Sequence, residues 1–472
     1  MITGIKSPLA SMLSRMSFSS TSADSSRMVK DLTLPAAANS STQVTFGSQT
    51  ESIASTYNLS PKKISATATD QASDVIQSLM QNAQENDSIN GFSGLGSALL
   101  NNLKDNRADF TQAIAGSDLG AYSTRKSAVS LSITTQSGTT VRLSLARQND
   151  GIAVSVKTEG GELTDAEAEA IGELGKAFQS ALDGLGGETP KLEIGDLTKF
   201  DSTLLKSVDL KTDVRQSDNS TQSLNFYADD TKRYVAYQDL DFSLKLTSDR
   251  STLTGGSLLE QEMALKAYDK QFDQARIDGH GDRNQMDMLK SAFHALNTTQ
   301  PTTTPTLPDT TVVRVGANAK PQFGGLNDFS LSLTQAEKSI NPSRMGEKVS
   351  FSYQASQTTS ETEESDGSRS LKQTTQNRLS ASWYQPLDPS IPLSLGTTKA
   401  SQNYVYHTLE RDEVNSTTMN FDNKGVLASI KNESQLNKLE TMKKYVMGVL
   451  EDKSETPEKY KRESFMDLLG NK

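Results

Sequence analysis

The stretch that decides the fold is residues 128–185, AVSLSITTQSGTTVRLSLARQNDGIAVSVKTEGGELTDAEAEAIGELGKAFQSALDGL. Hydrophobic residues alternate with polar or small ones in three runs, which are Val129–Ile133, Val141–Leu145 and Ile152–Val156. This alternation is the period of a half-buried strand. Ser137-Gly138 and the Asn149–Gly151 segment between the runs favour tight hairpin turns. The stretch therefore predicts a three-stranded antiparallel meander with one apolar face.

An amphipathic helix is expected directly after this meander. Thr164 and Glu167 have the spacing of a capping box, in which two side chains satisfy free backbone N–H groups at the helix start. The hydrophobic residues behind the box fall on one helical stripe, namely Ile171, Leu174, Phe178, Leu182 and Leu185. A sheet with one apolar face and a helix with one apolar stripe form a packing unit, so we interpret residues 128–185 as structural core.

Composition and charge limit the classes of function. The chain has 472 residues, a formal net charge of −10 and 34% hydrophobic residues. Nucleic-acid recognition usually needs a clustered basic patch, so we expect no nucleic-acid partner. The absence of cysteine excludes a disulfide framework and a thiol nucleophile. No apolar run approaches the ~20 residues that span a bilayer, and the N-terminus lacks the apolar core of a secretory signal peptide. We expect no membrane span, and a location in the cytoplasm or export without a classical signal peptide.

The sequence predicts an α+β fold of several modules, in which antiparallel β-meanders are covered by amphipathic helices. Residues 1–64 are rich in Ser and Thr and are expected to form a disordered N-terminal leader. Residues 65–297 are expected to hold a helical pair and β-meander/helix modules. Residues 298–309 contain TTQPTTTPTLP, which is typical of an extended Thr/Pro linker. Residues 310–472 are expected to form a β-rich module that ends in a C-terminal helical pair.

Two helical pairs and one repeat were inferred from residue spacing. The first pair rests on residues 72–79 and on Leu99, Leu103, Phe110 and Ile114. The C-terminal pair rests on the apolar spacing from Leu436 to Val449, and on Thr456-Pro457 as a cap followed by proline at the first helical position. The segments 241–247, DFSLKLT, and 328–334, DFSLSLT, are nearly identical. This likeness suggests an internal duplication, although alternating Ser and hydrophobic residues also produce such matches by chance.

The only segment similar to a metal-binding loop is residues 278–284, DGHGDRN. It places Asp278, His280, Asp282 and Asn284 at alternate positions, as an EF-hand loop does, but it has Arg283 where that loop needs glycine and Leu289 where it needs glutamate. We interpret it as a polar turn between helices. The three histidines, His280, His294 and His407, show no ligand spacing. No catalytic, cofactor-binding or metal-binding residue is therefore predicted.

Two stretches resemble known groups of proteins. The meander, the segment 161–167 (GELTDAE) and the following Leu192, Leu197 and Phe200 resemble a segment of uncharacterised Ser/Thr-rich bacterial proteins across residues 128–205. This resemblance implies no activity. The N-terminus is similar to the export signals of bacterial type III secretion substrates, because nine serines lie between Ser7 and Ser26 and no acidic residue precedes Asp24. That resemblance implies export through a narrow channel.

The sequence favours a non-catalytic structural or protein-interaction protein of bacterial type. It would bind a protein partner through exposed sheet edges or through the terminal helices. The alternative is a secreted protein or effector that leaves the cell without a signal peptide. A third hypothesis is a hydrolase with a dispersed carboxylate site, because Asp and Glu together number 58.

Overall fold

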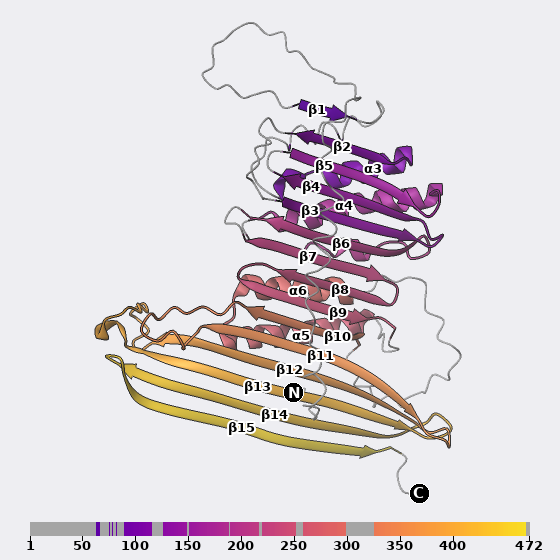
Figure 1. Ribbon diagram of the computed structural model, residues 1–472. Helices are drawn as coiled ribbons and strands as arrows, with labels where there is room; N and C mark the ends of the chain where they lie inside the picture. The colour runs from indigo at the N-terminus through magenta and orange to yellow at the C-terminus, as the bar shows by residue number, and fades with distance from the viewer. Residues whose placement is uncertain are drawn as a thin grey trace, which may run out of the picture. The chain divides into compact units, whose positions relative to one another are not determined.

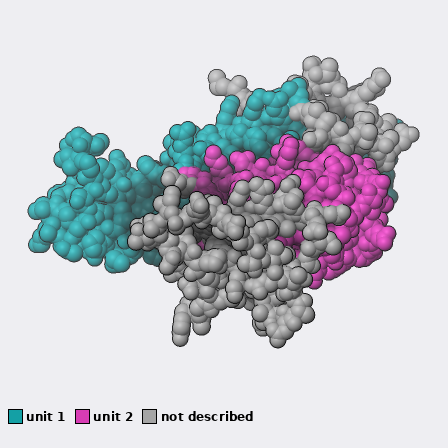
Figure 2. Space-filling view, turned by 90° about the horizontal axis from the view of Figure 1, so that it is seen from above, with its two compact units in different colours: residues 1–17, 241–472 teal, residues 18–240 magenta. Residues whose placement is uncertain are grey.

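The computed structural model describes residues 63–66, 75, 78, 82, 89–115, 126–148, 151–187, 189–216, 220–251, 258–298 and 325–468. The chain divides between Leu240 and Asp241 into two compact units (Figure 2). The first unit along the chain is the magenta one, labelled unit 2 in that figure, and the second, from Asp241 onward, is the teal one, labelled unit 1. All strand pairs with a described register are antiparallel, and the fold is mixed α+β. The predicted leader, apart from Lys63 and Ile64, and the predicted linker, apart from Thr298, lie outside the described residues. Their roles stay predictions.

The first unit is built on the strand order β1-β2-β5-β4-β3-β6-β7-β8. The strands are β1 (Lys63–Ala66), β2 (Phe110–Ala115), β3 (Lys126–Thr135), β4 (Thr140–Gln148), β5 (Gly151–Glu159), β6 (Leu205–Arg215), β7 (Thr221–Asp229) and β8 (Lys232–Gln238). The helices are η2 (Asn90–Phe92), α3 (Leu95–Asn106), α4 (Asp165–Leu185) and η3 (Asp196–Thr198). The predicted meander is confirmed as β3, β4 and β5.

The predicted capping box of α4 is also confirmed. Thr164 Oγ1 accepts a hydrogen bond from the backbone N–H of Glu167 at 3.3 Å, and the Thr164 N–H donates to Glu167 Oε2 at 2.9 Å. Burial alone would raise the pKa of Glu167, but hydrogen bonds from Thr164, Ser137 and Thr135 lower it to about 2. The glutamate therefore stays ionised, and its charge suits the N-terminus of the helix.

Residues 95–115 form one helix and one strand, so the helix predicted to continue to Ile114 was wrong. α3 ends at Asn106, because Arg107 adopts a left-handed conformation with φ of 50°. Phe110 and Ile114 belong to β2, where they pair with Val156 and Ile152 of β5. The other half of the predicted pair, residues 72–79, lies mostly outside the described residues.

The second unit is a meander in which each strand pairs with the next, from β9 to β15 (Figure 1). Its elements are β9 (Phe242–Asp249), α5 (Leu258–Gly279), α6 (Arg283–Asn297), β10 (Asp328–Gln335), β11 (Ser350–Glu363), β12 (Arg369–Pro386), η4 (Lys399–Ser401), β13 (Tyr404–Phe421), β14 (Leu427–Val446) and β15 (Val449–Asp467). Strand length grows from 8 residues in β10 to 20 in β14.

An aromatic cluster forms the core where α5 and α6 contact the strands. Tyr268 of α5 lies edge-on to Phe329 of β10, with ring centroids 5.0 Å apart. Phe272 of α5 approaches both Phe293 of α6, at 5.2 Å, and Tyr353 of β11, at 5.9 Å. Edge-to-face pairs add to the free energy gained from burying these rings.

The predicted C-terminal helical pair was wrong, because both segments are strands. The apolar residues from Leu436 to Val446 lie in β14, and Thr456 and Pro457 lie in β15. The connection is a two-residue turn with positive φ at Met447 (50°) and Gly448 (78°), which is the conformation of the hairpin turn that matches strand twist. A proline inside an edge strand is permitted where its missing N–H faces away from the neighbour.

The two similar segments DFSLKLT and DFSLSLT are neighbouring strands. Leu244 of β9 pairs with Leu333 of β10, and Leu246 pairs with Leu331, in an antiparallel register. Both strands have alternate residues buried. A shared place in one sheet is therefore sufficient to explain their common pattern.

Candidate functional site

The metal-like segment 278–284 is the turn that joins α5 to α6, as interpreted from the sequence. The Asp282 carboxylate caps α6 by accepting the N–H of Gln285 at 3.0 Å. Asp278 Oδ2 accepts a hydrogen bond at 2.5 Å from Arg411 Nη1 on β13. The two carboxylates therefore have separate structural partners. Among the described residues, no group of three or more His, Cys, Asp or Glu side chains is placed to hold a metal ion.

Two glycines let this turn approach the sheet closely. A Cβ atom added to Gly281 would lie 2.7 Å from the ring of Phe351 in β11, and one added to Gly279 would lie 2.9 Å from it. Both distances are shorter than real Cβ contacts, so a side chain at either position would push the turn away. His280 between them has a φ of 55°, a conformation that residues other than glycine rarely adopt.

The turn brings His280 onto the only tryptophan of the chain. The ring centroids of His280 and Trp383 are 4.4 Å apart with an interplanar angle of 28°. Trp383 of β12 also pairs directly with His407 of β13, and their rings are nearly parallel, 4.9 Å apart. The structure thus gathers two of the three histidines around one indole. Sequence spacing could not reveal this, because the residues lie 103 and 24 positions from Trp383 (383 − 280 and 407 − 383).

His407 is buried without hydrogen bonds. It is 8% exposed, and neither its Nδ1 nor its Nε2 has a hydrogen-bond partner among the described residues; the same is true of Trp383 Nε1. Glu440 Oε1 lies 3.7 Å from Nδ1, too far for a hydrogen bond. Burial lowers the pKa of His407, while Glu440 opposes this in part. Burial also lowers the pKa of His280. Both imidazoles are therefore neutral near pH 7.

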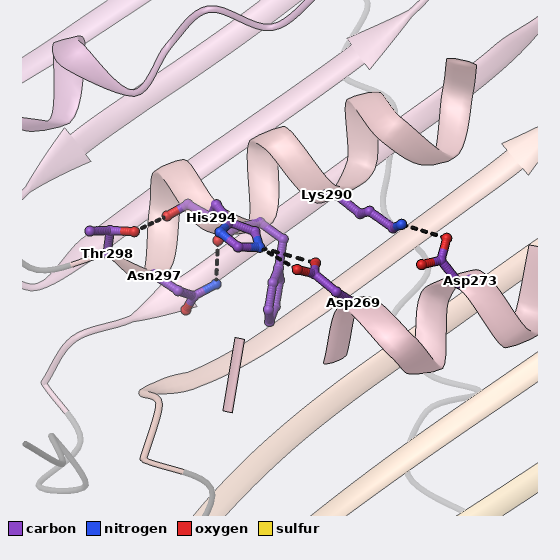
Figure 3. A network of polar contacts seen from close by, with 7 residues as sticks. Asp269, Asp273, Lys290, His294, Asn297 and Thr298 are labelled. Carbon is purple, nitrogen blue, oxygen red and sulfur yellow. Dashed lines mark hydrogen bonds and ion pairs between the residues drawn. The ribbon is translucent and has the colours of Figure 1, made fainter. Parts of the chain in front are cut away.

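The third histidine has a different role (Figure 3). His294 Nε2 of α6 lies 3.0 Å from both carboxylate oxygens of Asp269 in α5, and Lys290 Nζ lies 2.5 Å from Asp273. Asn297 Nδ2 donates to the backbone oxygen of Phe293 at 2.9 Å. The contacts of His294 and Lys290 join the two helices along one side, so we assign His294 to the packing of the hairpin.

A buried carboxylate fixes the segment before β11. Glu347 accepts hydrogen bonds from the hydroxyls of Tyr404, at 2.8 Å, and Tyr445, at 2.7 Å. Burial, followed by the bond to Glu347, raises the pKa of Tyr445 to about 12. Arg344 lies over the Tyr445 ring, with its guanidinium carbon 4.2 Å from the centroid. Both carboxylate oxygens of Glu347 therefore accept a tyrosine hydroxyl, which indicates a structural clasp.

Asp328 is the group that bears on the hydrolase hypothesis. Burial raises its pKa, and the nearby Asp249 adds to this, whereas hydrogen bonds from Thr359 oppose it. Its two oxygens accept the Thr359 N–H at 2.6 Å and the Thr359 hydroxyl at 2.8 Å. These bonds join β10 to β11, so a structural role accounts for this carboxylate.

The last strand forms an open edge of the second unit. β15 ends the strand order and pairs with β14 from Val449 to Asp467. Its side chains are exposed except for two half-buried positions, and Val449 and Phe465 are 65% and 64% exposed. Leu468 donates its N–H to Ala428 of β14. Because backbone groups alternate in direction, even-numbered residues of the regular ladder face β14 and odd-numbered residues present N–H and C=O groups outward.

In comparisons with known proteins, no protein-family model, curated protein or solved structure matches the chain. None of the described helices is both long and apolar enough to cross a bilayer.

Proposed function

We propose that this chain is a non-catalytic interaction protein that binds an extended segment of a partner protein along the open edge of β15. The observation that supports the proposal is the 19-residue edge strand, which is exposed on both faces and pairs with β14 alone in the strand order. An added strand would use the outward N–H and C=O groups for affinity and the flanking side chains for specificity. The two segments predicted from the sequence as terminal helices are β14 and β15.

The edge is most suited to binding after Pro457. Proline has no N–H, so it interrupts the outward donors, whereas the odd-numbered residues from Lys459 to Asp467 provide an unbroken series. Lys459 and Lys461 lie at one end of this series, and the exposed Phe465 lies at the other. Because opposite charges pair favourably across strands, the partner segment carries acidic residues opposite the lysines and a hydrophobic residue opposite Phe465.

Several residues of β15 disfavour edge-to-edge pairing between two copies of this protein. Lysines and proline on edge strands are the usual means by which proteins avoid edge-to-edge association. β15 has Lys453, Pro457, Lys459 and Lys461 on its outward positions. A heterologous segment with complementary charge is therefore the preferred occupant.

The test is a peptide-display selection against the full chain, with Lys461→Pro for counter-selection. Lys461→Pro removes an outward donor without removing a bond to β14, and Lys461→Ala is the matched control that keeps the donor. We expect peptides that bind the wild type and Lys461→Ala but not Lys461→Pro, with alternating acidic residues and one apolar position. Calorimetry on synthesised peptides measures the affinities.

Peptides that bind all three proteins equally would overturn strand addition at β15. So would a selection that enriches no extended acidic sequence. Sedimentation of the unliganded protein provides a further check, because stable self-association through β15 would replace the heterologous partner by a second copy.

We also propose export as a second function of the chain, on the composition of residues 1–26. A reporter fused to residues 1–64 should leave the cell through a type III apparatus, and deletion of residues 2–26 should abolish this. Secretion that does not depend on the apparatus, or on residues 2–26, would contradict this proposal.

A further inference from the structure

We propose that the turn formed by Gly279, His280 and Gly281 is an acid-labile anchor. It stays on the sheet while His280 and His407 are neutral, and it leaves the sheet when these imidazoles bind protons. This is independent of the proposed binding at β15, because it concerns the contact of the α5–α6 hairpin with β11, β12 and β13.

The anchor is a stack of aromatic faces in which His280 is exposed and His407 is buried. The carboxylate nearest to His407, that of Glu440, lies 3.7 Å from Nδ1, beyond hydrogen-bond distance. Trp383 contacts both imidazoles through its ring faces. A second proton on His407 would create a buried cation whose Nε2–H has no hydrogen-bond partner among the described residues and whose Nδ1–H has only the carboxylate of Glu440 at 3.7 Å. Attraction between a cation and the indole ring offsets part of this cost for one histidine. Two cations on one indole would also repel each other.

The charged groups around the stack already have partners. Asp278, next to the turn, is paired with Arg411 of β13, which adds positive charge to the site. Glu440 of β14 is the carboxylate nearest His407, and Lys438 lies 3.6 Å from it. Asp282 of the turn caps α6. Glu440 is thus the one of these carboxylates that faces His407, at a distance too long for a hydrogen bond in the described structure.

The turn is also held by close contact with Phe351, at a backbone conformation that is unusual for histidine. A gap of only about 0.5–1 Å forfeits roughly a quarter to a half of such contact energy, so a small displacement of the turn weakens the anchor.

The direction of the pH effect follows from the lowered pKa values of both histidines. The released form has the ordinary imidazole pKa of about 6.5 and binds protons first as pH falls. The anchored form is therefore fully stable above that value and loses stability as pH drops below it, towards the lowered pKa.

Trp383 is the only tryptophan, so its fluorescence reports on this site alone. We would follow the emission maximum and quenching by acrylamide on the full chain from about pH 8 to about pH 5. The expected result is a red shift and greater access for acrylamide, with a midpoint below the ordinary imidazole pKa. His407→Phe keeps the aromatic stack but cannot titrate, and His280→Asn tolerates the left-handed conformation without titrating; both should reduce the change. His294→Gln is the control and should leave it intact.

Three outcomes would overturn the proposal. The first is an emission maximum that stays constant over this pH range. The second is a red shift that is the same in the wild type, His407→Phe and His280→Asn. The third is a loss of intensity without a red shift or greater acrylamide access, because that would indicate protonated imidazoles that remain stacked on the indole.

Discussion

β3 and β15 are both strands of antiparallel ladders, yet different forces stabilise them. In β3, Val129, Leu131 and Ile133 are at most 1% exposed. In β15, by contrast, the side chains face solvent on both sides of the sheet. The contacts of its side chains with β14 include ion pairs, such as Glu463 with Lys431 at 3.0 Å and Glu451 with Lys444 at 2.8 Å.

The difference shows which strand the molecule can use for binding. Burial contributes about 25 cal/mol for each Å² of apolar surface removed from water. A favourable cross-strand pair on a solvated surface contributes only about 0.2–1 kcal/mol. Segments with few buried contacts open at low free energy, and binding surfaces are often drawn from them. β3 is thus a support of the fold, whereas β15 is a strand that a partner would stabilise.

The largest expected effect is from a truncation in the buried strand. Leu131→Ala should lower the free energy of unfolding by about 2–5 kcal/mol, because it leaves a cavity in the core. Leu439→Ala in β14, where the side chain is 41% exposed, is the matched control and should cost at most about 1 kcal/mol. Urea unfolding measures both. Equal losses would contradict the contrast between buried and open strands.

An intermediate effect is expected in the clasp before β11. Glu347→Gln keeps one acceptor for the hydroxyls of Tyr404 and Tyr445 but presents an amide N–H to the other, so the free energy of unfolding should fall by about 1–3 kcal/mol. Tyr445→Phe removes one of the two donors and provides the comparison. The clasp would have no stabilising role if both variants unfolded at the wild-type urea concentration.

Short-range patterns predicted the parts of the fold in which burial follows one period. The alternation through Val129, Leu143 and Val154 predicted β3 to β5, and Thr164 and Glu167 predicted the start of α4. In α5, the apolar residues near the start of the helix do not belong to the core. Leu259 and Met263 are exposed, while Tyr268 and Phe272 contact the core.

Strands β14 and β15 were mistaken for helices, because the hydrophobic residues of β14 lie on both faces of the sheet. Leu436 is buried and Leu439 is exposed on the opposite side, so a spacing of three residues imitated a helix. Gly448, which adopts a positive φ in the structure, was the available sequence signal for a hairpin turn. The site was found only in part: DGHGDRN was recognised as a turn, but its contact with Trp383 depends on the register between β12 and β13, which a single sequence does not encode locally.

The smallest expected change in stability concerns Pro457, where the open strand meets the proposed interface. Pro457→Val restores an N–H on the outward side, so it adds no bond to β14 and should change the free energy of unfolding by at most about 1 kcal/mol. The restored donor makes the outward series continuous from Lys453 to Asp467, and we expect measurable self-association in sedimentation velocity at high concentration. Thr456→Val is the control, since it adds the same branched side chain at a position whose N–H faces β14. A large loss of stability in Pro457→Val would mean that the outward direction assigned to this residue is wrong, and with it the face of β15 offered to a partner.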